Sequence, residues 1–343
     1  MTRQSEIWLY IARRLIGTLP LLIGVGIFTF VLVRVLPGDP AAYYATGPLA
    51  TQEEIAQVRQ ALGLDRPWPE QLARYFRDIA TGDLGRSLVT GQLVGRDLLE
   101  RFPASFELTF VAMTIALIVS IPLGIVAAIR AGSWIDHLAR LIGTIGVSMP
   151  AFVAGIVLIY VLYFHLGIAP EPIDRIDPFI LKPPPMTGLM LIDSLIARDG
   201  AAFSSAAGRL LLPALTMAVI VIAPLMRMTR ASMIAVLESD FIRTARAAGM
   251  SPWTVYVRYA LRNAMLPVLT TVGLVVSYQL GANVVVEKVF AWPGVGSYAL
   301  NSLLASDYAP VQGYVLLMAC VYVVINSVID IIYALVDPRV RIQ

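Results

Sequence analysis

The chain has 343 residues, of which 58% are hydrophobic and 14% are charged, and its formal net charge is +3. The mean hydropathy of +0.75 and a charged fraction well below the roughly 25% of soluble domains exclude an ordinary soluble globular protein and indicate an integral membrane protein. The single cysteine, Cys320, excludes an intrachain disulfide.

Six apolar runs are long enough to cross a bilayer, for which about 20 helical residues are needed. They cover residues 15–36, 104–129, 138–164, 210–228, 265–286 and 311–336. Backbone polar groups inside lipid must be bonded within their own segment, so runs of this length predict helices rather than barrel strands. We therefore expect an all-α integral membrane protein with six transmembrane helices in a single transmembrane domain, residues 1–343.

The first run follows Arg13 and Arg14, which would also suit a signal peptide. However, the run is longer than a signal core, and "RVLPGDP" stands where a small-residue cleavage site would be. We expect it to be a retained first helix. Arginines concentrate on one side of the six runs, and the positive-inside rule places that side, with both the N- and the C-terminus, in the cytosol.

Two long segments are then extracytoplasmic, and both are predicted to be ordered. In the loop 37–103, Thr51 and Glu54 have the spacing of a capping box, and 69–79 is a second amphipathic segment. These features favour a small folded cap over a dedicated recognition surface. In the loop 167–209, three consecutive prolines from Pro183 exclude helix.

The centres of the spans carry neutral polar side chains and almost no ionisable groups. The polar residues are Ser277, Gln279 and Asn283 in the fifth run and Asn326 in the sixth. Two interpretations are open and compatible: hydrogen bonding between helices and a translocation pathway for a polar substrate. A proton- or sodium-coupled carrier is poorly supported, because charges in mid-membrane usually mark such pathways.

The cytoplasmic segment 229–264 contains "DFIRTARAAGMSPWTVYVRYALRNAM", which predicts two helices around a turn. Gly249 suits the position after the first helix, and Ser251 with Pro252 suits the start of the second. Helical spacing predicts one apolar face in each helix. These faces would be formed by Phe241, Ala245 and Ala248 in the first and by Trp253, Val257, Ala260 and Ala264 in the second.

Three functions compete for this basic helix pair. A DNA-binding helix-turn-helix is disfavoured, because the second helix runs directly into a membrane span and would be held at the bilayer. A membrane-surface helix and a docking surface for a cytosolic partner remain nearly even. The residues of the docking alternative are Arg243, Thr244, Ala245, Arg246, Gly249, Ser251 and Pro252.

The stretch "DFIRTARAAGMSPWTVYVRYALRNAMLPVL" resembles the cytoplasmic loop of permease subunits of ATP-binding-cassette importers of the dipeptide/oligopeptide (peptide/nickel) family. Gly249 and Ala245 match that family's loop, whereas Arg243 and Thr244 replace the glutamate and first alanine of the wider superfamily. "GDLGRS", "MRMTRAS" and "VFAWPGVGSYALNSLLASDYAPVQG" follow the same family in the same order.

The resemblance implies a type I importer permease fold in the bacterial inner membrane. It implies as partners a second homologous permease in a heterodimer, two cytosolic ATPases and an extracytoplasmic substrate-binding protein, besides membrane lipid. The implied function is the permease of an ATP-driven importer for di- or oligopeptides, with nickel or glutathione as alternative substrates.

Nothing in the sequence predicts that this chain is itself an enzyme. It has no Gly-x-x-x-x-Gly-Lys-Ser/Thr pattern, so ATP and Mg²⁺ would be bound by the ATPase subunits. His137 and His165 fall on opposite sides of the membrane, and we expect no catalytic residue, metal site, cofactor or nucleic-acid partner. A rival interpretation is a membrane receptor or assembly subunit that uses the same loop for a partner other than an ATPase.

Overall fold

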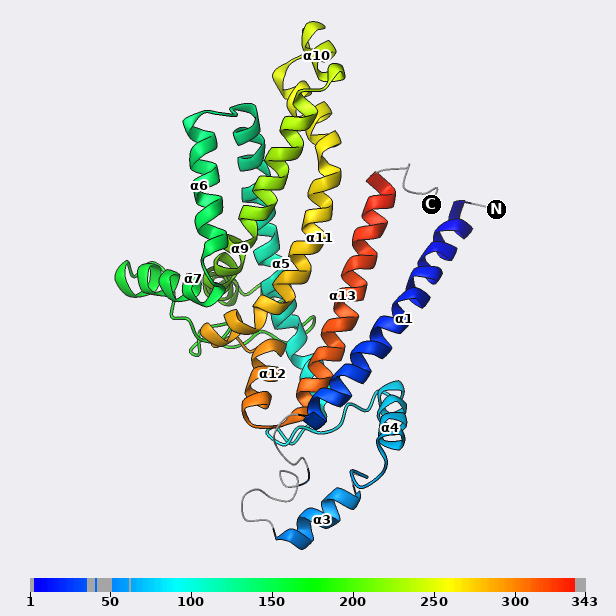
Figure 1. Cartoon of the computed structure of the whole chain (residues 1–343). Coiled ribbons are helices and arrows are strands. Elements are labelled where there is room, and N and C mark those ends of the chain that lie inside the picture. The colour runs from blue at the N-terminus through cyan, green and yellow to red at the C-terminus, as the bar shows by residue number, and fades with distance from the viewer. Residues whose placement is uncertain (1–2, 36–40, 42–50, 62, 337–343) are drawn as a thin grey trace. The chain divides into compact units, whose positions relative to one another are not determined.

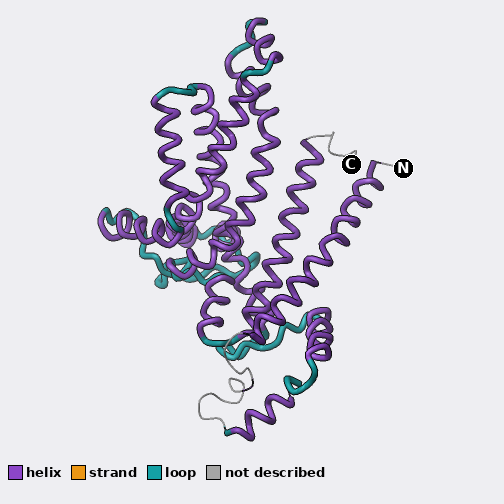
Figure 2. Tube along the Cα trace, viewed as in Figure 1, coloured by secondary structure: helices purple, strands orange, loops and turns teal. Residues whose placement is uncertain are grey.

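The protein is built from helices joined by loops (Figure 1, Figure 2). A computed structural model describes residues 3–35, 41, 51–61 and 63–336, and within these ranges the only extended pairing is an isolated bridge between Arg86 and Leu93. The expected all-α fold class is confirmed.

The helices follow one another along the chain with few long connections. They are α1 (Arg3–Val35), α3 (Gln52–Ala61), α4 (Trp68–Ala80), α5 (Val94–Ile129), α6 (Trp134–Ser148), α7 (Ala151–Leu158), η1 (Ile159–His165), α8 (Met190–Ile196), α9 (Gly200–Leu237), α10 (Asp240–Ala247), η2 (Thr254–Leu261), α11 (Arg262–Val289), α12 (Val295–Leu304) and α13 (Tyr308–Val336). The segments η1 and η2 are π-helical.

The chain divides into two compact units. Unit 1 comprises Met1–Pro103 and Gly294–Ser327, and unit 2 comprises Ala104–Pro293 and Val328–Gln343. The division falls inside α5 and α13, so the first turns of α5 belong to unit 1 and the rest of that helix to unit 2.

Five of the helical segments are long and apolar enough to cross a membrane. They are Gly17–Val35, Val94–Ile129, Gly200–Leu237, Thr254–Val289 and Tyr308–Ile329. A sixth crossing is present if Trp134–Gly146 and Ala151–His165 form one broken span, because these two helices meet at an angle of 106°.

The apolar run 138–164, expected to be the third span, is thus interrupted at Pro150. Pro150 has no backbone N–H to continue the helix, and it disfavours helical geometry in the residue before it. Met149 accordingly lies in the extended region, at φ −96° and ψ 122°. The apolar run is as long as a span, but its second half turns away from the first.

Helix α9 is the centre of unit 2, since 67% of its apolar window is buried. Small residues allow neighbouring helices to approach it closely. A Cβ on Gly124 of α5 would lie 2.6 Å from the Cβ of Thr229, and a Cβ on Gly143 of α6 would lie 2.9 Å from Cε of Met226. Glycine is required at position 124, where the Met226 carbonyl also lies 2.9 Å away, whereas at position 143 the flexible end of Met226 would have to move.

The second outer loop is fixed to unit 2 by buried charges. Arg175 donates to Glu107 of α5 at 2.7 Å, and Arg209 at the base of α9 donates to Asp177 at 3.1 Å and to the carbonyl of Glu171 at 3.1 Å. The three consecutive prolines are not helical, as predicted.

The pKa of the Asp177 carboxyl is lowered by the hydrogen bond from the Phe179 backbone N–H and by the Arg209 guanidinium, against the opposing effect of burial. The charged form of Asp177 is therefore the form that the folded loop stabilises.

The first long loop, in unit 1, is folded in its described part, as predicted. Thr51 and Glu54 form the capping box, with the Thr51 N–H 2.8 Å from Glu54 Oε2 and the Glu54 N–H 3.3 Å from Thr51 Oγ1. The amphipathic helix α4 packs on α1, where Tyr75 Oη lies 3.1 Å from Thr29 Oγ1 and the Tyr75 ring meets that of Phe30. Residues 36–40 and 42–50 of this loop lie outside the described part of the chain.

Candidate functional site

Helix α10 is a short helix with a sharply defined end. The N–H of Met250 donates to the carbonyl of Ala245 at 3.2 Å, and the N–H of Gly249 donates to that of Arg246 at 3.0 Å. This is the Schellman arrangement, which places the residue after the helix in the left-handed region, and Gly249 has φ +70°. The prediction that Gly249 ends the first helix is confirmed.

The second helix of the pair begins as predicted. Ser251 Oγ accepts from the Thr254 N–H at 3.4 Å, and Pro252 occupies the first turn, where its missing N–H removes no helical bond. The chain then continues through η2 into the span helix α11 without a break. Any displacement of this turn therefore acts directly on a membrane helix.

The predicted apolar faces of the two helices were partly wrong. In α10 the buried pair is Ile242 and Ala245, whereas Phe241 is 45% exposed. In the second helix Ala260 and Ala264 are buried as expected, but Trp253 is 74% exposed and Val255 is buried in place of Val257. The π-helical turn explains the shift, because its i to i+5 spacing brings residues 255 and 260 onto one face.

The seven residues predicted for docking lie together on α10 and the turn that follows it. Ala245 packs inward and the other six are exposed. Arg243, whose partner the sequence did not indicate, lies 3.2 Å from Asp240 and donates to the Glu238 carbonyl at 3.3 Å. Surface pairs of this kind contribute little to stability, so Arg243 remains available to a partner.

Exposed apolar side chains surround this basic segment. Phe241, Met250 and Trp253 are 45%, 40% and 74% exposed. A surface that combines aromatic side chains, methionine and arginine has the composition of a protein interface. Phe241 lies at the start of α10, and Met250 and Trp253 lie at the turn that follows it.

The membrane part of α11 carries a buried polar face. Gln279 and Asn283 are 1% and 2% exposed, and Glu287, four residues further, is fully buried. Both amide atoms of Gln279 and Oδ1 of Asn283 have no hydrogen-bond partner, whereas Glu287 accepts from Ser105 Oγ at 2.5 Å. Sequence reasoning missed Glu287, although its spacing of four from Asn283 was a signal for it.

The other two residues predicted for the pathway do not join this face. Ser277 donates to the Gly273 carbonyl at 3.0 Å, and Asn326, which belongs to α13 in unit 1, donates to the Tyr322 carbonyl at 2.8 Å. Both bonds are to the residue four positions earlier and satisfy the side chain within its own helix. Of the four predicted pathway residues, only Gln279 and Asn283 are left with unused buried hydrogen-bonding groups.

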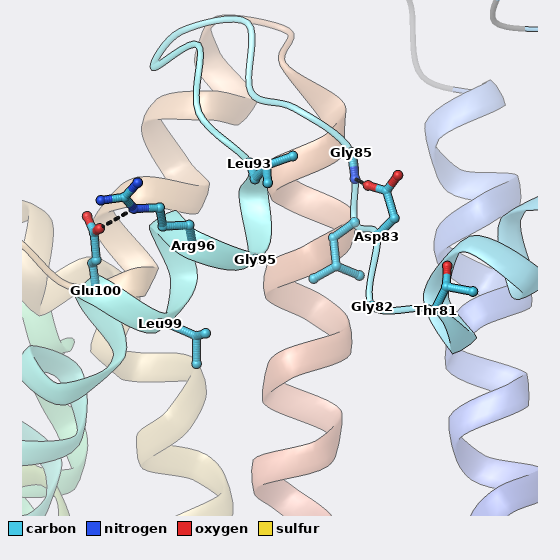
Figure 3. Close-up of a pocket in the computed structure, with 10 residues that line it drawn as sticks. Thr81, Gly82, Asp83, Gly85, Leu93, Gly95, Arg96, Leu99 and Glu100 are labelled. Atoms are coloured by element: carbon cyan, nitrogen blue, oxygen red, sulfur yellow. Dashed lines mark hydrogen bonds and ion pairs between the residues drawn. The ribbon is translucent and has the colours of Figure 1, made fainter.

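The outer part of unit 1 contains an open pocket of about 610 Å³ beside the "GDLGRS" turn (Figure 3). Asp83 accepts from the Gly85 N–H at 2.9 Å, and Arg96 pairs with Glu100 at 2.8 Å on the rim. Figure 3 shows the Arg96–Glu100 pair on α5, which follows the hairpin closed by the Arg86–Leu93 bridge, with Leu99 pointing toward the opening of the pocket.

Two buried carboxylates hold the same hairpin in place. Asp307 Oδ2 accepts from Ser87 Oγ at 2.6 Å and from the Leu88 N–H at 2.7 Å. Asp97 Oδ2 accepts from Tyr298 Oη at 2.8 Å, and burial together with Asp97 raises the pKa of the Tyr298 hydroxyl well above its ordinary value. These bonds tie the segment around the "GDLGRS" turn to the rest of unit 1.

The described residues contain no group of three or more His, Cys, Asp or Glu side chains that could hold a metal ion. The polar features described above are the exposed basic residues of α10, the buried amides of Gln279 and Asn283 and the "GDLGRS" turn.

Comparison with known families covers nearly the whole chain. Residues 120–342 match the family described as binding-protein-dependent transport system inner membrane component, and residues 7–109 match the corresponding N-terminal family.

Three similar proteins are permeases of transport systems with different named substrates. The chain is 39% identical over 333 residues to the probable D,D-dipeptide transport system permease of Escherichia coli, which covers 97% of each chain. It is 39% identical to the di/tripeptide transport system permease of Pseudomonas aeruginosa, over 97% of this chain and 99% of the relative. It is 37% identical to the glutathione transport system permease of Escherichia coli, over 97% of this chain and 98% of the relative.

Proposed function

Because the chain belongs to the family of binding-protein-dependent transport system inner membrane components, we propose that it is the permease subunit of an ATP-driven importer for di- or oligopeptides in a bacterial cytoplasmic membrane. The observation that carries this proposal is the 39% identity to dipeptide and di/tripeptide permeases over 97% of the chain. The spans of α1, α5, α9, α11 and α13 supply the membrane domain.

The energy source lies outside this chain. The sequence has no phosphate-binding Walker A pattern, so ATP hydrolysis is assigned to cytosolic ATPase subunits that dock on α10 and the turn at Gly249. The exposed arginines and the apolar residues around the turn support this assignment. A second, homologous permease would complete the pathway, and an extracytoplasmic binding protein would deliver the peptide.

The transport cycle follows from the position of α10. An ATPase that binds α10 more tightly in one conformation of the permease shifts the equilibrium toward that conformation. Because η2 continues into α11 and α9 leads into α10, a displacement of the turn is transmitted to two membrane helices at once. With the termini and α10 in the cytosol, closure of the ATPases opens the spans toward the binding protein.

Neutral polar groups suit a pathway that must release its substrate. Peptides are zwitterionic and differ in their side chains, so a charged site would hold some of them too tightly. Gln279 and Asn283 are neutral and have unused hydrogen-bonding atoms. They become part of the pathway only when α11 moves relative to its neighbours, because in this conformation both are buried.

A glutathione importer is the second candidate, since a glutathione permease is 37% identical to the chain. Glutathione is itself a tripeptide, so the same permease chemistry would serve. Reconstitution of the complete importer in proteoliposomes tests both, with dialanine and glutathione as probes. ATP-dependent uptake of dialanine supports the peptide assignment. Uptake of glutathione alone would replace it, and uptake of neither with all subunits present would refute both.

A further inference from the structure

The end of unit 2 nearest to α10 contains a buried ion pair that the function described above does not use. Asp136, in the first turn of α6, is 1% exposed. Two N–H groups of Arg230 in α9 donate to this carboxylate, from Nε to Oδ1 at 2.5 Å and from Nη2 to Oδ2 at 2.8 Å. The Gly132 N–H, in the turn between α5 and α6, also donates to Oδ2 at 3.0 Å. One carboxylate therefore joins α9, α6 and the turn before it.

An apolar cluster connects the end of α9 that carries Arg230 to the docking segment. From Arg230, helix α9 continues for two turns to Leu237, and α10 begins three residues later. Met233 of α9 packs with Ile242 of α10 and with Ala128 at the end of α5 in one buried apolar cluster. The ends of α5, α6 and α9 and the whole of α10 therefore form one block.

Apolar contacts alone would allow the helices of this block to slide, because they have no directional preference. A bidentate arginine–carboxylate pair fixes distance and orientation together. It also cannot open cheaply in place, because the buried Asp136 carboxylate would keep only the more distant and half-exposed Arg140, at 3.8 Å, as a cationic partner. The pair thus fixes the position of α6 along α9 at the end of these helices that is connected to α10, on which a cytosolic partner would act.

We propose that Arg230 and Asp136 are positioning residues for energy coupling: their ion pair makes α6 and the α5–α6 turn move together with α9 and α10 when a cytosolic ATPase acts on α10. This inference rests on the proposed function of α10 as the ATPase-docking element. It assigns a role to Arg230 in the "MRMTRAS" stretch, which lies in the membrane domain and outside the docking surface itself.

Unit 2 supplies a matched control for a purely structural role. Glu107 and Arg175 also form a buried ion pair, with side-chain exposures of 5% and 10% and a separation of 2.7 Å. Glu107 lies 22 residues before Ile129, which is about 33 Å along α5 at 1.5 Å per residue. In the Asp136–Arg230 pair the exposures are 1% and 25%, so both pairs have a buried carboxylate, but the Glu107–Arg175 pair is remote from α10.

The test uses the complete importer with its copurified ATPases and binding protein in proteoliposomes, with dialanine as the probe. In the double variant Asp136→Asn with Arg230→Gln, neither charge remains, so no buried charge is left unpaired and the helices still pack. We expect the ATPases to copurify and to hydrolyse ATP. The amount of dialanine transported per ATP should fall about tenfold, which corresponds to about 1.4 kcal/mol of lost coupling energy.

The control variant combines Glu107→Gln with Arg175→Gln and should keep the ratio of peptide to ATP. An unchanged ratio in the Asp136/Arg230 variant, or an equal fall in the control, would overturn the inference. Loss of ATPase copurification from the unsubstituted chain would instead contradict the proposed function of α10, so the two failures are distinguishable.

Discussion

Substitution of Gly249 tests the docking surface most directly. Its φ of +70° costs a residue with a Cβ about 1–2 kcal/mol relative to glycine. No heavy atom lies within 4 Å of the position that its Cβ would take, so no steric cost within the chain is added. Gly249→Leu should therefore leave the protein inserted and folded, with a modest loss of local stability.

The larger effect is expected at the interface with the ATPase. A side chain inserted into a well-packed contact costs about 1–3 kcal/mol, which corresponds to roughly a 5- to 150-fold weaker interaction. Copurification of the ATPases with detergent-solubilised permease measures docking, and uptake of dialanine by proteoliposomes measures transport. Both should fall together in Gly249→Leu.

Gly167 is the control for backbone strain. It has φ +64°, and no heavy atom lies within 4 Å of the position that its Cβ would take, but it follows η1 and is far along the chain from α10. Gly167→Leu introduces the same strain and should leave docking unchanged. Normal docking and uptake by Gly249→Leu would refute the reasoning, as would an equal loss in both variants.

Three further predictions concern the other polar features. Replacing Gln279 and Asn283 together by Leu removes unpaired buried amides, each of which costs about 1–3 kcal/mol, so the melting temperature of the protein should rise. Dialanine uptake should fall. Unchanged uptake would show that the two residues have a structural role only. Asp307→Asn removes the charged acceptor of the 87–89 segment, so limited proteolysis of that hairpin should accelerate while ATPase copurification is unaffected. The pKa of Asp177 is lowered from 3.8, so the stability that its carboxylate adds is present above that value and is lost as pH falls below it. Protease protection of the second outer loop should therefore be constant from about pH 8 to about pH 5 and should decrease below about pH 4. A decrease already at pH 6 would contradict this expectation.

Local signals in the sequence predicted local structure well. The capping box at Thr51 and the helix end at Gly249 depend on residues within five positions of one another, and the structure confirms both. Five of the apolar runs likewise lie in helices of the described residues that are long and apolar enough to cross a membrane. These predictions succeeded because burial in lipid and helix capping follow from composition and short-range spacing.

Two features go beyond what regular helical periodicity predicts, and both are departures from a regular α-helix within an apolar segment. Pro150 bends the third run by 106°, and the π-helical turn of η2 places Val255, rather than Val257, in the core. A period of 3.6 residues predicts the wrong face beyond such a point. The proline was visible in the sequence, whereas no residue pattern marked the π-helical turn.

The placement of buried charge was not predictable from spacing, because each pair joins residues that are distant in the chain. Asp136 and Arg230 are separated by 94 positions, and Glu107 and Arg175 by 68. In both pairs one partner is at an end of an apolar run. Such residues look like ordinary boundary charges that reach toward water, and only the fold shows that they are buried and paired.

Under the proposed mechanism, this distribution of charge separates the parts of unit 2 that stay together from those that move. Rigid ion pairs fix α9 to α6 at the end near α10 and fix α5 to the second outer loop at the other end. Between them, α11 contributes Gln279 and Asn283, whose unused hydrogen-bonding atoms cost free energy in the present conformation. A second conformation that gives these amides water or peptide partners recovers that cost. The unpaired amides therefore favour movement of α11, the helix that η2 connects directly to the docking turn.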